Sequence, residues 1–103
     1  MIARVWRGWT KPEDGDVYER LLRETVFPAI RGRIDGFRAG YVMRRDVGGE
    51  AEFLVMTVFD SLTAVRRFAG DDYEEPVIEP EAARLLTRRE LQAAHYVVII
   101  DRP

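Results

Sequence analysis

The sequence predicts an α+β fold of the split β-α-β, ferredoxin-like type, in which a four-stranded antiparallel sheet carries its helices on one face. Two observations predict it. The first is composition: 103 residues, 47% apolar and 33% charged, are the size and balance of one ordinary globular domain. The second is that strand-like and helix-like runs follow one another in the order β-α-β-β-α-(α)-β. We therefore take residues 1–103 as a single domain.

Four runs read as strands. Residues 2–9, IARVWRGW, are short, aromatic and β-branched. Residues 37–47 and 50–60 are joined across Gly48-Gly49, a pair suited to a hairpin turn that needs positive φ. The last strand is expected from about Ala94 to Ile100.

A long helix is expected between the first two strands. Thr10 and Glu13 match a capping box, and Asp14 is an equally suitable cap. Apolar residues then recur on one helical face from Val17 to Ile30. Pro28 lies inside this pattern and predicts a kink, because proline removes one backbone hydrogen bond.

Two short helices are expected in the second half of the chain. Ser61 is a suitable N-cap for the first, and Gly70 ends it. Pro80 opens the second, whose apolar positions are Ala82, Ala83, Leu85 and Leu86.

Two of the strands are apolar at almost every position. In a sheet covered on one face only, apolar and polar residues should alternate, yet FLVMTVF (residues 53–59) and YVVII (residues 96–100) do not alternate. The helices of one chain cover one face. The sequence therefore predicts a homodimer in which two sheets pack face to face.

Composition argues against several classes of function. The formal net charge of −2 gives no electrostatic reason to expect a nucleic-acid partner, and the absence of cysteine excludes disulfides and thiolate metal sites. No apolar run approaches the ~20 residues of a membrane helix, so we expect a cytoplasmic protein with no membrane partner. The acidic run DDYEE, residues 71–75, lacks metal-ligand spacing, and no nucleotide-binding motif is present; we expect neither a metal nor a cofactor.

Three stretches carry a resemblance to a known family. The opening IARVWRGWT, the block VFPAIRGRIDGFRAGYVMRRDVGGEAEFLVMTVFDSLTAVRRFAGDDYE and the closing HYVVI resemble the antibiotic biosynthesis monooxygenase-like superfamily, the dimeric α+β barrels. The most specific piece is the strand that leads into FDSLTAVRRFAGDD. The resemblance implies the fold and the homodimer. Its members include cofactor-free oxygenases of aromatic polyketides, haem-degrading monooxygenases and quinone-modifying enzymes, so it leaves the chemistry open.

The motif of the haem-degrading members is missing. These proteins carry a Trp in the short helix and a haem-ligating His about ten residues later, and counting along this chain puts Phe68 and Ile78 near those positions. No Asn is present to match their first-strand Asn. Haem iron would need another donor, such as His95 or Tyr73.

His95 is the candidate catalytic base. It is the only histidine, and histidine alone has an unperturbed pKa, ~6.5, in the useful range. The alternative is a rim residue hydrogen-bonded to backbone or to a carboxylate. Alternation places His95 and Val97 on the same face of the last strand, and which face meets the helices is left open.

Four aromatic residues are candidates for substrate binding. Trp6 lies in the middle of the first strand, where it would form a wall for a flat ligand, with core packing or a dimer contact as the alternative. Tyr41 and Tyr73 carry hydroxyls that donate or accept. Phe68 in the short helix is the fourth, with the core again as the alternative.

Two functions remain open. The favoured one is a cofactor-independent monooxygenase, or a related oxidoreductase, acting on a small aromatic, quinone-like or polyketide-type substrate in a pocket between sheet and helices. It predicts that His95→Ala lowers turnover ~10²-fold or more. The alternative is a non-catalytic dimeric barrel that binds a small apolar ligand or a protein partner. An open cavity above ~300 Å³ with converging polar groups would favour the enzyme.

Overall fold

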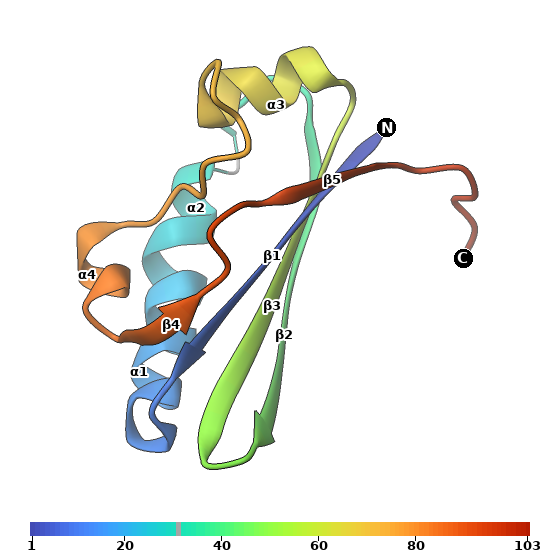
Figure 1. The fold of residues 1–103 in the computed structure, drawn as a ribbon. Coiled ribbons are helices and arrows are strands. Elements are labelled where there is room, and N and C mark those ends of the chain that lie inside the picture. The colour runs from blue at the N-terminus through green and yellow to red at the C-terminus, as the bar shows by residue number, and fades with distance from the viewer. Residues whose placement is uncertain (31) are drawn as a thin grey trace.

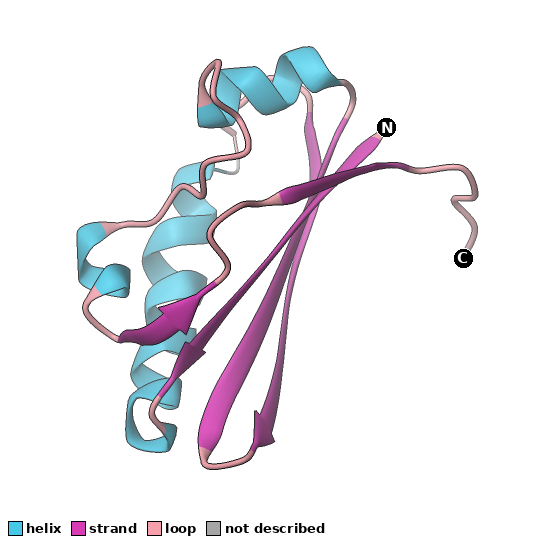
Figure 2. Ribbon diagram, viewed as in Figure 1, coloured by secondary structure: helices cyan, strands magenta, loops and turns pink. Residues whose placement is uncertain are grey.

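The computed structural model describes residues 1–30 and 32–103 and has the expected α+β architecture (Figures 1 and 2). Within these residues an antiparallel sheet of five strands has the order β2-β3-β1-β4, with β5 also paired to β1. Helices α1, α2 and α4 lie on one side of this sheet, and α3 lies across one end (Figure 1). The elements are β1 (Ile2–Thr10), α1 (Pro12–Leu21), a π-helical segment (Leu22–Val26), α2 (Phe27–Ile30), β2 (Phe37–Val47), β3 (Glu50–Phe59), α3 (Leu62–Ala69), α4 (Pro80–Ala83), β4 (Leu86–Arg89) and β5 (Ala94–Val97).

The predicted capping box at the start of α1 is wrong. The N-cap is Lys11, which makes no side-chain cap bond, and Pro12 is the first helical residue. Thr10 is held in β1 by pairing with Ala51, and its hydroxyl donates to the Lys11 carbonyl at 2.8 Å. Sheet pairing therefore prevents Thr10 from capping, and Asp14 lies within the helix.

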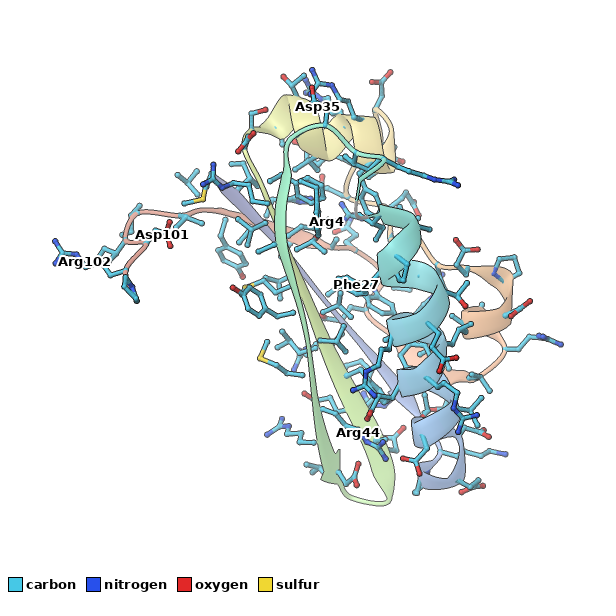
Figure 3. All side chains as sticks on the ribbon, turned by 180° about the vertical axis from the view of Figure 1, so that it is seen from behind. Arg4, Phe27, Asp35, Arg44, Asp101 and Arg102 are labelled. Atoms are coloured by element: carbon cyan, nitrogen blue, oxygen red, sulfur yellow. The ribbon has the colours of Figure 1, made fainter. Side chains whose placement is uncertain are left out.

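The irregularity expected near Pro28 takes the form of a wider turn before it. Residues Leu22–Val26 are π-helical, and the Phe27 N–H donates to the Leu22 carbonyl. Pro28 has no N–H to give to the preceding turn. π-Helical turns are rare and often occur at functional sites. Here the turn is followed directly by Phe27, which lies between the helix and the sheet (Figure 3).

The hairpin and the α3 cap are confirmed. Gly48 and Gly49 have φ values of 59° and 78°, as a primed hairpin turn requires. The Ser61 hydroxyl accepts a hydrogen bond from the Ala64 N–H at 3.2 Å, and Gly70 follows the end of α3 with φ 85°.

The C-terminal region contains one more strand than expected. β5 confirms the first part of the predicted last strand. The second short helix begins at Pro80 as predicted but ends at Ala83, and Leu86, which the sequence assigned to it, is the first residue of β4. Both strands pair with the same edge of β1, β4 near Gly8 and β5 near Ile2. The fourth strand of the expected fold is thus split in two.

One face of the sheet packs on the helices, and the other is open in the single chain. Phe53, Thr57 and Phe59 of β3 are buried beneath the helical layer. The helix-free face, as the register defines it, carries the large apolar side chains Val5, Tyr41, Met43, Val47, Leu54, Met56, Val58 and Tyr96. Tyr41 and Tyr96 are 52% and 60% exposed. The homodimer that would cover this face stays a prediction.

Candidate functional site

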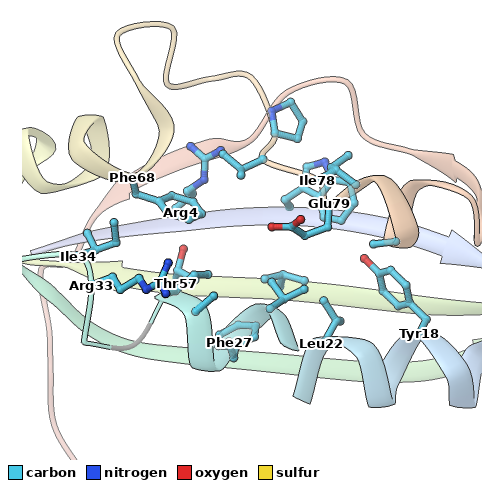
Figure 4. Close-up of a pocket in the computed structure, with 18 residues that line it drawn as sticks. Arg4, Tyr18, Leu22, Phe27, Arg33, Ile34, Thr57, Phe68, Ile78 and Glu79 are labelled. Atoms are coloured by element: carbon cyan, nitrogen blue, oxygen red, sulfur yellow. The ribbon is translucent and has the colours of Figure 1, made fainter. Parts of the chain in front are cut away.

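A cavity of about 250 Å³ lies between the sheet and the helical layer (Figure 4). The core is divided into one cluster around Tyr18 and Phe53 and another around Phe59 and Val65. Residues of both clusters line the cavity: Tyr18 belongs to the first cluster, and Phe68 packs against the second. Its volume does not reach the ~300 Å³ that would favour the enzyme, although side chains do not fill it.

Arg4 is a buried cation in the wall of this cavity, with only 5% of its surface exposed. Its Nη1 donates to the Tyr73 carbonyl, and its Nη2 donates to the Glu75 carbonyl at 2.8 Å. The guanidinium also lies 5.6 Å from the centre of the Phe68 ring. Burial lowers the pKa of Arg4, because the charged form is separated from water.

His95 lies behind Arg4. The two side chains meet because residue 4 of β1 pairs with residue 95 of β5. Arg4 Nη1 is 3.0 Å from His95 Nε2, and since arginine only donates, Nε2 accepts and the imidazole is neutral there. Burial, followed by the Arg4 charge, lowers the pKa of His95, and Glu74 opposes this effect. The Tyr73 ring packs edge-on against the imidazole, with 5.0 Å between ring centres.

Further polar groups line the cavity from other elements. Figure 4 shows the Tyr18 and Thr57 hydroxyls and the Glu79 carboxylate directed toward the space between helix and sheet. Burial raises the pKa of Tyr18 to about 12, so this hydroxyl stays protonated. Arg33 and Glu79 are exposed residues at the rim.

The predicted site residues occupy three different places. Trp6 and Phe68 line the cavity, and the Trp6 indole N–H donates to the Glu90 carbonyl at 2.9 Å. Tyr73 and His95 lie behind Arg4, outside the described lining. Tyr41 is on the helix-free face, because it pairs with Met56 rather than with an inward-facing residue of β3.

Arg4 is the functional candidate that the sequence reasoning missed. Arg4 and Trp6 are two residues apart in one strand, so they share a face. The signal that could have identified Arg4 is a charged residue on the same strand face as a central Trp. Tyr18 belongs to the core and lines the cavity as well.

Among the described residues no group of three or more histidine, acidic or cysteine side chains is arranged to hold a metal ion. None of the helices described is both long enough and apolar enough to span a bilayer.

No family model matches the chain, and no curated protein matches it. Solved structures do resemble it. A provisionally assigned antibiotic biosynthesis monooxygenase from Deinococcus radiodurans has a TM-score of 0.67 at 16% identity, covering 100% of this chain and 97% of that one. A second protein with that provisional assignment, from Bacillus cereus, has a TM-score of 0.62 at 18% identity, covering 99% and 94%.

A third similar structure is that of the haem degrader MhuD from Mycobacterium tuberculosis, which has two haems bound in its active site. Its TM-score is 0.67 at 18% identity, and the match covers 100% of both chains. Structural similarity at such low sequence identity supports a shared fold but does not identify the reaction. The chain therefore has the fold of the antibiotic biosynthesis monooxygenase-like superfamily.

Proposed function

We propose that the protein is a cofactor-independent monooxygenase, or a related oxidoreductase, that acts on a small aromatic, quinone-like or polyketide-type substrate. The observation that carries this proposal is the cavity: its wall is mainly apolar, and a buried arginine, Arg4, forms part of it. Trp6, Phe27 and Phe68 offer ring faces and edges to a flat substrate. Such a cavity excludes water and strengthens the interaction of Arg4 with developing negative charge.

The substrate supplies the electrons in this reaction. An activated CH₂ between aromatic rings loses a proton, and the carbanion passes one electron to O₂. The resulting radical and superoxide combine to form a C–O bond, and the peroxide anion takes back the proton that the base removed. The hydroperoxide then loses water to leave a carbonyl. Overall, CH₂ and O₂ become C=O and H₂O, so no external reductant is needed.

The protein contributes a proton acceptor and a cation. We assign proton removal to Glu79, whose carboxylate is directed into the cavity from its rim (Figure 4). His95 enters the proposal through Arg4 rather than as the base, because its Nε2 already accepts from Arg4. Arg4 stabilises the carbanion and its oxygen-conjugated form.

We also propose that the functional unit is a homodimer formed by the helix-free face. Its exposed apolar side chains, among them Tyr41, Met43 and Tyr96, form the kind of surface that a second sheet covers. Light scattering at micromolar concentration should report twice the chain mass of 11.9 kDa. A monodisperse monomer would contradict this part of the proposal.

Oxygen uptake tests the reaction. Protein treated with a chelator is mixed with anthrones and naphthols, and O₂ consumption is followed together with incorporation of ¹⁸O from ¹⁸O₂. One labelled atom per product molecule, in the newly formed carbonyl, and one O₂ per product are expected. Val26→Trp should abolish turnover, because Val26 lines the cavity and the indole would fill it. Val17→Trp is the control, because Val17 lies in α1, directly before the segment that contains Val26, is 45% exposed and is not among the lining residues.

A non-catalytic ligand-binding barrel is the second candidate, and one observation favours it. No histidine lines the cavity among the described residues, so no side chain with an ordinary pKa near neutrality lies there. Binding of the same aromatic compounds without any O₂ uptake would select this candidate over the oxygenase.

The cavity residues do not fit haem. Phe68 and Ile78, which stand near the Trp and His positions of the haem degraders, both line the cavity, and neither ligates iron. Haem titration without a Soret shift is the expected result.

A further inference from the structure

We propose that the cavity binds its ligand as an anion, a planar aromatic carboxylate, phenolate or enolate, through Arg4, and that His95 is a positioning residue that holds the guanidinium. The inference deepens the proposed function by naming the charge of the substrate. It concerns the same cavity, and its test requires no turnover.

Arg4 lacks a carboxylate partner among the described residues. Its polar contacts are two backbone carbonyls and one imidazole. These groups solvate the cation but carry no opposite charge. The half-buried arginines among the described residues are neutralised: Arg7 pairs with Glu90, and Arg44 pairs with Asp16, Glu19 and Asp46. A buried charge without a counter-charge is costly to desolvate, and a bound anion in the adjoining cavity would compensate it.

Arg4 also has hydrogen-bond donors to spare. A guanidinium carries five N–H groups, and the contacts with Tyr73, His95 and Glu75 use three of them, leaving Nε–H and one Nη2–H. Nε has no partner among the described residues, and since no fully occluded side-chain nitrogen or oxygen there is without one, Nε is not fully occluded. Two free donors are what a carboxylate or a phenolate accepts from one arginine.

His95 fixes the orientation of the guanidinium. Its neutral Nε2 accepts from Nη1, and the Tyr73 ring packs against the imidazole at 5.0 Å. The Tyr73 and Glu75 carbonyls complete the arrangement on the side away from the cavity. A guanidinium held on one edge presents its other edge in a fixed direction, and this lowers the entropy lost when an anion binds.

The rim adds one charge of each sign. Arg33 and Glu79 both line the cavity and are exposed, so they face a bound anion with opposing effects through solvent. Glu79 forms no ion pair with Arg4 among the described residues. The deep, desolvated charge of Arg4 therefore decides the preference, while removal of the Glu79 charge should strengthen anion binding.

The test compares two probes of the same shape, 2-naphthoate and its neutral amide, 2-naphthamide, by calorimetry with the full chain. Wild-type protein is expected to bind the naphthoate at least about tenfold more tightly, the scale of one charge-assisted hydrogen bond. Arg4→Met should abolish the preference. Arg45→Met is the control, since Arg45 lies on the helix-free face and pairs with Glu52, and it should leave both affinities unchanged.

Two further variants separate the roles. Glu79→Gln should tighten naphthoate binding while it lowers turnover in the oxygen assay. His95→Leu should weaken naphthoate more than naphthamide, and His95→Gln should restore the preference, because its amide oxygen can accept from Arg4. If His95 served only to fill space, Leu and Gln would behave alike.

A measurement on wild-type protein keeps the inference testable if Arg4→Met does not fold. The ¹H–¹⁵N signal of Arg4 Nε should shift on addition of naphthoate and stay in place with naphthamide. Equal affinities of the two probes, or a naphthoate complex that leaves this signal unchanged, would overturn the inference. Neither probe has a CH₂ group that could be oxygenated, so the binding test is independent of turnover. If naphthoate is preferred but anthrones and naphthols cause no O₂ uptake, the proposed oxygenase activity is refuted while the anion site stands.

Discussion

Gly40→Ala should push Phe27 into the cavity. A Cβ built on Gly40 of β2 would lie 2.3 Å from Phe27 Cε1 and 3.1 Å from its Cδ1. Ordinary van der Waals contact begins near 3.4 Å, so the ring must move by about 1 Å. Overpacking of this kind costs about 1–3 kcal/mol, which lowers the Tm of a domain this size by roughly 4 °C or more.

Urea unfolding and a naphthoate titration measure the two effects. The stability should fall, and because Phe27 forms part of the cavity wall, the affinity for naphthoate should fall as well. Phe27→Leu shortens the side chain that the new methyl group meets. In that background Gly40→Ala should cost much less, which gives a coupling energy in a double-mutant cycle. Wild-type stability of the single variant, or penalties that simply add, would refute the reasoning.

Three other predictions concern single residues. The pKa of His95 is lowered in the fold, so the free energy of unfolding should be constant above the unfolded pKa of ~6.5 and should decline below it. Urea unfolding between pH 7.5 and 5 should show a smaller decline for His95→Gln than for wild-type protein. Parallel curves for the two proteins would contradict this. Ser61→Ala should cost about 1 kcal/mol by loss of the α3 cap, while Thr63→Ala in the same helix, at an exposed position, should cost far less in the same unfolding assay. Tyr18→Phe should change stability by less than about 1 kcal/mol, because its hydroxyl faces the cavity; a larger loss would show that the hydroxyl is bonded within the fold.

Local signals in the sequence were sufficient for the elements whose ends depend on neighbouring residues. Gly48-Gly49 supplies positive φ within the hairpin itself, and Ser61 caps a helix that begins at the next residue. Thr10 failed as a cap because its conformation is set by Ala51, a residue far along the chain. β4 was missed for the same reason: four residues show no strand periodicity, and their pairing with β1 defines them.

The site was predictable only in part. Trp6 follows from its central place in a strand, and Phe68 from its place in an amphipathic helix. The role of His95 could not be read from its own strand, because the register between β1 and β5 decides that it meets Arg4. Tyr41 shows the same limit, since a shift of one residue in the pairing of β2 with β3 would have turned it toward the helices.

The central position of β1 has a consequence for how the protein folds. The first strand is flanked on one side by β3 and on the other by β4 and β5, so Arg4 and His95 meet across 91 positions of chain. Contacts so distant in sequence slow folding, because the entropy of closing the loop is lost before the contact forms. During synthesis, one edge of β1 stays unpaired until β4 and β5 have left the ribosome. The guanidinium is therefore fixed in place only when β5 pairs with β1.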